Sequence, residues 1–326
     1  MPPNVSGRIP GTVGRFRAPA GAAGLRRPGA QGRWAGGGAL IAEVSGGAGE
    51  DTATDATPPA AVVRVAEPRP YSRYPAALQP VEVSLFDGPP HPADVVQGML
   101  NDCAVLATCM AIAHANPEVI AGMFSRRDTE VHCRSYSDPP GQYPGRASVC
   151  YTVRFRDREV ELSNRLYYTW GRLAYAHSPR NASWMCFLEK AFAMTAGGND
   201  YNRLDDSAGH LSAANVFERL VGPYQFADIP GNQLISSGGS SQPLTDIRLN
   251  NVLRAAETLP AIVATGETTP ADSGLEPNHA FAVLGLERGI VRIRNPRGGD
   301  QALVEMTPAA FRRSFVAVIQ AAGEAP

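Results

Sequence analysis

The most continuous apolar stretch of the chain runs from Cys103 to Ala115 and reads CAVLATCMAIAHA. Its length suits a helix, and because apolar side chains occupy nearly every face, that helix is expected to be buried in the middle of a lobe. A second helix is predicted over residues 184–195, where Trp184, Leu188 and Phe192 recur on one face. We expect its aromatic side chains to belong to the core.

Alternation of apolar and polar residues at period two predicts strands, most of them in the last third of the chain. Residues 151–169 read as paired strands with a polar turn at 156–158. Helices first and strands later favour an α+β fold of two lobes with a cleft between them. The further expected elements are strands over 261–265, 279–287 and 290–295, helices over 245–258 and from Thr307, and a flexible surface connection over 231–242.

The first part of the chain has a different composition. From Met1 to about Pro70, Gly, Ala, Pro and Arg dominate, with few aromatic residues and no sustained apolar period. Such a segment buries too little apolar surface to offset the entropy of ordering it. We therefore predict a disordered tail over 1–75 and a folded domain over 76–322, with lobes over 76–200 and 201–322.

Composition and charge exclude several classes of protein. A chain of 326 residues with 44% hydrophobic residues can bury a sizeable core. The net charge of −1 provides no positive field to attract phosphates, so nucleic acid is not an expected partner. No apolar run approaches the roughly 20 residues of a membrane span, and the N-terminus lacks the apolar region of a Sec signal peptide. The expected location is the cytoplasm, or outside the cell by a route without a Sec signal; the oligomeric state stays open.

The five cysteines are odd in number and irregularly spaced, which does not suggest a disulfide framework. Cys103 differs from the others because it stands at the start of the apolar helix, where the helix dipole favours the thiolate. Gln97 lies shortly upstream on a Gly-containing loop. Its side-chain amide and the backbone N–H of Cys103 could together hold an oxyanion. Taken alone, however, Cys103 would be read as an inert buried thiol.

A thiolate nucleophile needs an acid and base partner, and His279 is the best-placed histidine because it opens a predicted strand. If that strand pairs with residues 290–295 through the turn at Arg288-Gly289, His279 and Asn295 lie at the same open end of a hairpin. Asn295 could then fix the tautomer of the imidazole. The four groups together favour nucleophilic catalysis over an inert cysteine.

Four segments resemble the calpain family of cysteine proteases. QGMLNDCAVLATCMAIA resembles the active-cysteine segment of that family, and NHAFAVLGLE followed by VRIRNPRG resembles its histidine strand and Arg-Asn-Pro segment. WMCFLEKAFA resembles its Trp-x-x-Leu-Leu-Glu-Lys-Ala-Tyr-Ala helix, in which we interpret Glu189 and Lys190 as an exposed or locally paired ion couple. Glu305 to Phe315 resembles its closing segment. The matches keep the family's order from about Val81 to Ala321.

The resemblance implies a papain-like, two-lobed fold, with the cysteine at a helix start in a helical N-terminal lobe and a β-rich C-terminal lobe. It implies a cysteine-type endopeptidase acting on protein or peptide substrates through an acyl-enzyme intermediate. Cys103 would be the nucleophile, His279 the acid and base, Asn295 its orienting residue and Gln97 the oxyanion donor. Residues 266–278, which precede His279, would form a mobile loop beside the cleft.

Several positions depart from the family pattern. Ala104 and Arg297 replace tryptophans, and Asn101 and Asn278 stand where glycine is usual. These changes open the cleft wall and affect substrate selection more than the chemistry. The thiol chemistry requires no cofactor; calcium dependence is suggested by the family alone, since its calcium ligands cannot be carried over residue by residue. No metal site is expected, because His132, Cys133 and Cys150 lack the paired spacings of zinc ligands.

Two alternatives stay open from the sequence. The same thiol machinery could serve a non-proteolytic acyl transfer, such as deamidation or transamidation. The domain could also be a catalytically inactive module that keeps the cleft in order to bind peptides. The lost tryptophan at Ala104 supports the second alternative, whereas the retention of all four chemical groups opposes it.

Overall fold

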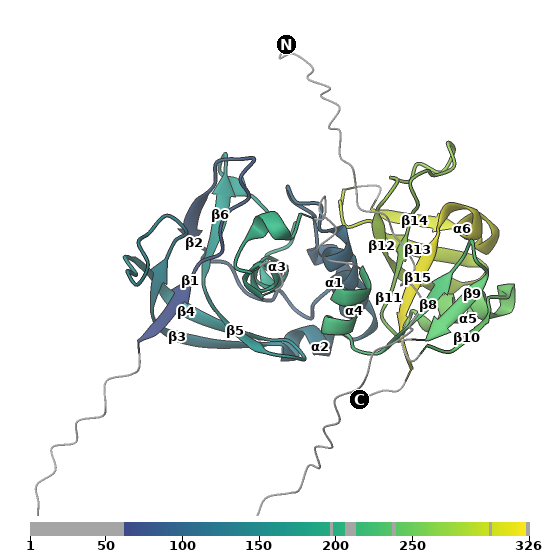
Figure 1. The fold of residues 1–326 in the computed structure, drawn as a ribbon, viewed down its shortest axis with the longest axis horizontal. Helices are drawn as coiled ribbons and strands as arrows, with labels where there is room; N and C mark the ends of the chain where they lie inside the picture. Colours follow the sequence, from purple (N-terminus) through teal and green to yellow (C-terminus); the bar gives the residue numbers. More distant parts are fainter. Residues whose placement is uncertain (1–61, 196–197, 206–212, 237–238, 300–301, 324–326) are drawn as a thin grey trace, which may run out of the picture. The chain divides into compact units, whose positions relative to one another are not determined.

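The computed structural model describes residues 62–195, 198–205, 213–236, 239–299 and 302–323. These residues form a mixed α+β structure of helices and three β-sheets (Figure 1). Within the described ranges, no helix has the length and apolar character that crossing a bilayer requires.

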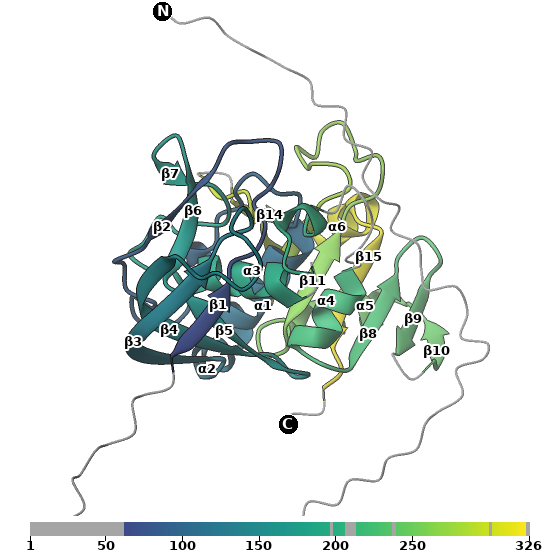
Figure 2. The ribbon, with the colours of Figure 1, turned by 60° about the vertical axis from the view of Figure 1, so that its left-hand side comes forward.

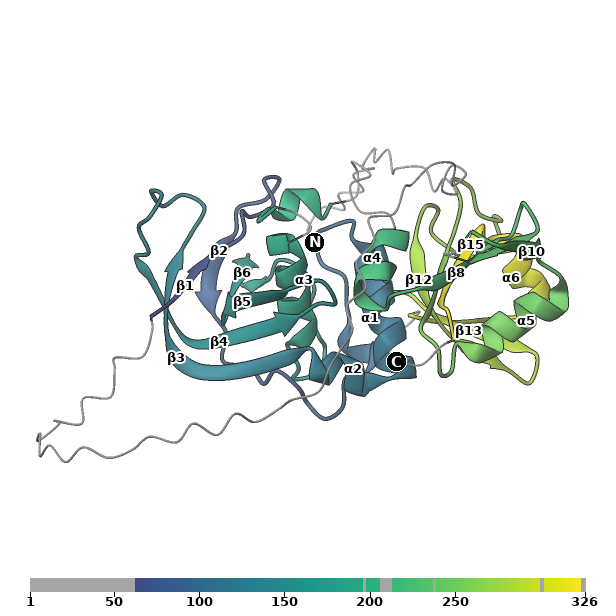
Figure 3. The same ribbon diagram turned by 60° about the horizontal axis from the view of Figure 1, so that its bottom comes forward.

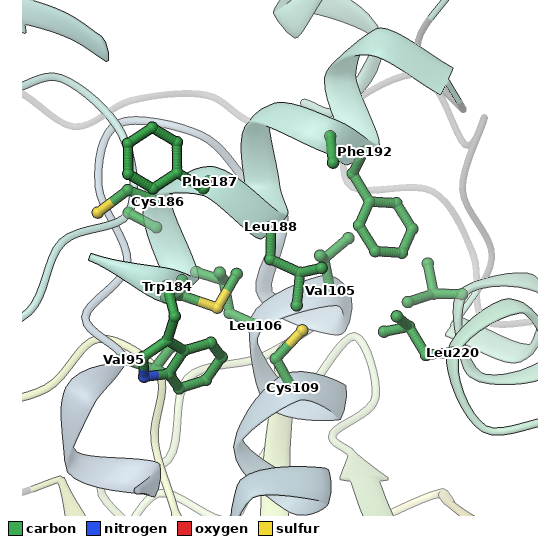
Figure 4. Close-up of a cluster of buried hydrophobic side chains, with 14 of the residues drawn as sticks. Val95, Val105, Leu106, Cys109, Trp184, Cys186, Phe187, Leu188, Phe192 and Leu220 are labelled. Carbon is green, nitrogen blue, oxygen red and sulfur yellow. The ribbon is translucent and has the colours of Figure 1, made fainter. Parts of the chain in front are cut away.

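Helix α1 (Cys103–Ala115) is covered on several sides, as its apolar sequence requires. Every residue from Ala104 to Ala113 is buried. Figures 1 and 3 both draw α1 between α3 and β12, and in Figure 4 Leu188 of α3 lies beside Val105 and Cys109 of α1. The elements distant in sequence that pack against α1 include α3 (Trp184–Thr195), α4 (Ala213–Leu220), β11 (Ala261–Ala264) and β12 (Ala280–Glu287).

The largest sheet has eight strands in the order β10-β9-β8-β15-β11-β12-β13-β14, and every neighbouring pair is antiparallel. Strand β12 is apolar on both faces because each face is covered. Ala280 and Ala282 join the core around α1, whereas Phe281 and Val283 join a second core on the other face with α5. The remaining elements of this part are β8 (Tyr224–Asp228), β9 (Gln233–Ser236), β10 (Ser241–Pro243), β13 (Ile290–Arg294), β14 (Leu303–Met306), β15 (Ala317–Ala321), α5 (Asp246–Ala255) and α6 (Pro308–Ser314).

Two smaller sheets belong to the first half of the chain, in the orders β1-β3-β4-β5 and β2-β6-β7. Strand β1 pairs in parallel with β3, and Figure 2 draws β1, β3, β4 and β5 in the same part of the structure. Strand β5 packs against α3. The elements are β1 (Val63–Ala66), β2 (Ala77–Pro80), β3 (Phe124–Arg134), β4 (Gly145–Arg154), β5 (Glu159–Ser163), β6 (Arg165–Thr169), β7 (Arg172–Leu173), α2 (Pro117–Gly122) and the 3-10 helices η1 (Pro92–Asp94) and η2 (Tyr201–Arg203).

Most predicted elements are present. The helices at 103–115 and 184–195 have the predicted bounds. The helix predicted over 245–258 is capped by the Thr245 side chain and ends at Ala255. The last helix begins with Pro308 behind a Thr307 cap. In both helices the threonine side chain accepts a hydrogen bond from the backbone N–H of the first turn.

Two expectations were wrong. Residues 231–242 are not only a surface connection, because they contain β9 and β10, which pair with each other and extend the large sheet beyond β8. Their Ser and Gly content hid strands at a sheet edge, where one side of the ladder faces solvent. The predicted end of the disordered tail, at residue 75, was also too late in the chain, since Val63–Ala66 is a strand and Tyr71 is buried. Residues 1–61 lie outside the described part.

A buried ion pair ties this early strand to helix α3. Lys190 Nζ lies 2.6 Å from Glu67 Oε2, and both side chains are about fully buried, at 1% and 0% exposure. Lys190 also donates to the carbonyl oxygens of Ser163 (3.1 Å) and Arg165 (2.7 Å), while the Ser163 hydroxyl donates to Glu67. Lys190 is therefore not part of an exposed or local pair with Glu189, as the sequence suggested. The partner of Lys190 stands 123 positions earlier, where no helical spacing could reveal it.

The Lys190→Met variant should lose about 3–5 kcal/mol in free energy of unfolding, because it leaves the Glu67 carboxylate buried without its cation. Urea unfolding of the full chain measures this loss. The double variant Lys190→Met with Glu67→Gln should recover most of it. The matched surface control is Arg154→Met, which breaks an exposed pair with Glu159 and should cost less than about 1 kcal/mol. Equal losses in Lys190→Met and Arg154→Met would contradict the assignment.

Candidate active site

Cys103 is the first residue of α1 and is half-buried. The N-terminal turn of a helix presents backbone N–H groups and the positive end of the dipole, which favour a thiolate. The other cysteine of the helix, Cys109, is fully buried, and desolvation raises the pKa of its thiol well above the ordinary value. The two thiols of α1 thus lie in opposite environments, and only that of Cys103 suits nucleophilic chemistry.

The loop before α1 is held against the loop that follows β13. The backbone N–H of Gln97 donates to the carbonyl oxygen of Pro296 at 2.7 Å. Gly98 packs so closely on Tyr175 that a Cβ would lie 2.3 Å from its backbone carbonyl, which explains the glycine at this position. The hydrogen bond from Gln97 to Pro296 joins the segment that leads into Cys103 to the segment that follows Asn295.

The Gln97 side chain is buried, and its Nε2 donates to the carbonyl oxygen of Leu100 at 2.5 Å. This bond fixes the amide group within the loop that precedes Cys103. An amide nitrogen carries two hydrogens, so one N–H remains for another acceptor.

His279 and Asn295 lie at the same open end of the β12–β13 hairpin. His279 immediately precedes β12 and Asn295 immediately follows β13. His279 Nε2 lies 2.8 Å from Asn295 Oδ1. Thr265 at the end of β11 fixes the backbone of the histidine, because its hydroxyl oxygen accepts the His279 N–H at 2.9 Å. The ring edge also packs against Phe281, with centroids 4.8 Å apart.

The hydrogen bonds of Asn295 determine which ring nitrogen carries the proton. Asn295 Oδ1 accepts the backbone N–H of Arg297 at 2.9 Å, so this atom is an acceptor and Nε2 of His279 is the donor. In the neutral imidazole, Nδ1 then carries the lone pair. Burial lowers the pKa of His279, while the bond to Asn295 acts in the opposite direction. The ring is thus oriented so that Nδ1 can take up and release a proton.

An ion pair that has no local signal in the sequence lies beside Nδ1 of His279. Arg297 Nε donates to both carboxylate oxygens of Glu276, at 2.9 and 3.2 Å. Glu276 Oε2 lies 3.9 Å from Nδ1 of His279. Glu276 and Arg297 are 21 positions apart on different loops, so only the pairing of β12 with β13 brings them together.

A second unrecognised feature is a pair of buried carboxyls at the start of α1. Asp102 precedes Cys103, is 2% exposed and makes no side-chain capping bond to its own helix. Its carboxyl interacts with that of Glu189 on α3, whose two oxygens accept the Ala176 N–H at 3.0 and 3.2 Å. Desolvation raises the pKa of Asp102 to about 7 and that of Glu189 well above its ordinary value. Two carboxyls that interact at a buried site cannot both ionise, so the pair holds one proton between them.

The segment 266–278, expected to be a mobile loop, has several internal hydrogen bonds. The Thr265 hydroxyl donates to the carbonyl oxygen of Glu276 at 2.7 Å, and the Asn278 N–H donates to that of Gly266 at 2.8 Å. Leu275 is buried in the second core. These contacts close the loop at its base, beside His279.

Among the residues that the structure describes, no three side chains of His, Cys, Asp or Glu come together as a metal site.

Comparison with protein families identifies the class of the domain as a cysteine protease. The model of the calpain family cysteine proteases matches residues 71–303, well over half of the chain. The chain therefore belongs to the calpain family, as the four resembling segments predicted. No curated protein matches the chain. The family match begins after β1, so this strand and Glu67 precede the matched region.

The free energy of unfolding should depend on the Asp102–Glu189 pair. Since burial raises both pKa values in the folded protein, the folded state keeps a proton that the unfolded chain releases above about pH 4. Stability should therefore fall as the pH rises toward 7 and above. The Glu189→Gln variant donates an N–H without ionising, so its advantage over wild type should grow by about 2 kcal/mol between pH 5 and pH 8.

Urea unfolding at the two pH values measures this difference. The control is Glu161→Gln, because Glu161 is half-exposed in a surface pair with Arg127 and should give the same difference from wild type at both. A Glu189→Gln variant whose difference from wild type does not change with pH would exclude a shared proton.

Proposed function

We propose that this domain is a cysteine endopeptidase that works through Cys103, His279 and Asn295. The Cys103 thiolate attacks the carbonyl carbon of a peptide bond, and His279 protonates the leaving amine from Nδ1. Water then attacks the thioester with His279 as base, which releases the acid product and restores the thiol. The observation that carries the proposal is the 2.8 Å bond from His279 to Asn295, on the hairpin that packs against the helix of Cys103.

Gln97 is the proposed oxyanion donor. As the carbonyl becomes tetrahedral, its oxygen gains negative charge and is stabilised by donors already in place. The second Nε2 hydrogen of Gln97 and the backbone N–H of Cys103 would supply them. The bond from Gln97 to Leu100 supports this role, because it holds the amide without using both of its hydrogens.

The proposed architecture is papain-like, with one lobe built around α1 and α3 and a second around the large sheet. The contacts of α1 with β11 and β12 support it, since they join the helix of the nucleophile to the strands that carry His279 and Asn295. η2 and α4 pack with the first core, so the proposed boundary falls after Leu220 rather than at 200.

A protease domain acts on protein substrates, and the proposed mechanism has no calcium step. Ala104 directly follows the nucleophile and carries a small side chain.

The Cys103→Ala variant should lose hydrolysis of an unfolded protein such as casein and labelling by a thiol-directed inactivator, because no other group supplies the nucleophile. Its fold should be unchanged, since the residue is half-buried and alanine suits the first turn of a helix. Mass spectrometry of the casein products, with and without added calcium, measures the activity.

The matched control is Cys109→Ala on the same helix, which removes a buried thiol and should retain both hydrolysis and labelling of Cys103. Undiminished hydrolysis by Cys103→Ala would refute the proposal. Wild-type protein that changes the mass of casein without cleaving it would indicate deamidation or transamidation instead. Tight binding of casein with an unreactive Cys103 would indicate an inactive peptide-binding module.

A further inference from the structure

The ion pair between Glu276 and Arg297 lies beside the ring nitrogen that exchanges protons in the proposed mechanism. Glu276 belongs to the loop that leads into His279, and Arg297 to the loop that follows Asn295. Their hydrogen bonds of 2.9 and 3.2 Å therefore connect the segment before β12 to the segment after β13 at the open end of the hairpin. The side chains of Glu276 and Arg297 are nearly half exposed, at 40% and 46%, whereas His279 itself is buried, so the ion pair lies between the histidine and solvent.

The two charges act on His279 in opposite directions. The Glu276 carboxylate stabilises the imidazolium and raises the pKa of His279, whereas the Arg297 guanidinium lowers it. The carboxylate lies 3.9 Å from Nδ1, beyond the 2.6–3.2 Å of a direct hydrogen bond. At this distance it stabilises the charged ring without holding the proton in a bond of its own.

We propose that Glu276 is a positioning residue for the acid of the reaction: its carboxylate, held in place by Arg297, keeps the proton of the His279 imidazolium on Nδ1 until the leaving amine takes it. This role rests on the proposed function. Arg297 donates two hydrogen bonds to this carboxylate, and its positive charge offsets part of the effect of Glu276 on the ring. The proton moves from Nδ1 to the nitrogen of the broken peptide bond, and Glu276 stays ionised throughout.

Other groups around the ring do not provide this charge. Thr265 and Asn295 are neutral and bond the backbone N–H and Nε2 of His279, and Phe281 packs against the ring edge. Helix α1 contributes the Cys103 thiol, which is the proposed nucleophile, and the buried Asp102, whose carboxyl interacts with Arg297. Apart from the proposed Cys103 thiolate, the charged groups that act on His279 among the described residues include Glu276 and Arg297.

The pH dependence of kcat/KM separates this role from a merely structural one. In the proposed mechanism, turnover falls on the alkaline side as the imidazolium loses its proton. Glu276→Gln should move the alkaline limb down by about half a pH unit, since one charge at about 4 Å in a half-exposed site has a modest effect. Arg297→Gln should move it up by a similar amount, while the backbone N–H of residue 297 still bonds Asn295. If the ion pair served only to hold the two loops together, both substitutions would break it and would change kcat/KM in the same way.

The matched controls are Glu159→Gln and Arg154→Gln, which break an exposed pair with the same bond type far from His279 in the β4–β5 sheet. Neither should move the limb. Shifts of the same sign in Glu276→Gln and Arg297→Gln, or no shift in either, would overturn the role of Glu276.

An NMR titration of the His279 ring gives the same answer without turnover. The His279 resonance is assigned by its loss in His279→Ala, and its midpoint should fall in Glu276→Gln and rise in Arg297→Gln. If wild-type protein does not hydrolyse casein, the proposed function fails while the titration still tests the electrostatic effect of Glu276. If hydrolysis depends on Cys103 but the titration midpoints do not separate, the role of Glu276 fails alone.

Discussion

The structure depends on the burial of one helix that has no polar face. Ten successive residues of α1 are withdrawn from water, which requires packing partners around the helix. α3 and α4 cover part of its surface, and β11 and β12 of the large sheet cover another part. Because these partners come from both halves of the chain, the hydrophobic effect that buries α1 also joins the two halves. The helix start, where Cys103 lies, is thereby fixed relative to the β12–β13 hairpin.

Charges that are buried in this core are arranged so that each has a partner from a distant segment. Glu189 and Lys190 are neighbours on α3, yet Glu189 shares its carboxyl contact with Asp102 and Lys190 pairs with Glu67. Consecutive helical residues point in directions about 100° apart, so they cannot share one partner. One contact fixes α3 to the residue before Cys103, and the other fixes α3 to the strand that precedes the family-matched region. Removal of Lys190 leaves the Glu67 carboxylate as a charge that the core cannot solvate, which makes that contact costly to break.

Much of this fold was predictable because its signals are local. An apolar run and period-two alternation each act over a few residues, so α1 and the β12–β13 hairpin followed directly from the sequence. The hairpin in turn predicted that His279 and Asn295 meet. The contacts that escaped prediction join residues whose separation in sequence carries no pattern, such as Glu67 with Lys190 or Glu276 with Arg297. Strands β9 and β10 were missed for a related reason, since their pairing at a sheet edge does not require apolar residues.

The distribution of rigid and loop segments around the candidate site has a mechanical consequence. Cys103, His279 and Asn295 each lie at or next to the end of a helix or strand, so packing in the two cores fixes the positions of their backbone atoms. Their mutual alignment depends on the short loops beyond those ends, where the Gln97 N–H bonds Pro296 and Arg297 bonds Glu276. Such loop contacts are weaker than the cores and can rearrange without unfolding either of them. Substitutions in the loops are therefore expected to act on the chemistry, and substitutions around α1 on stability.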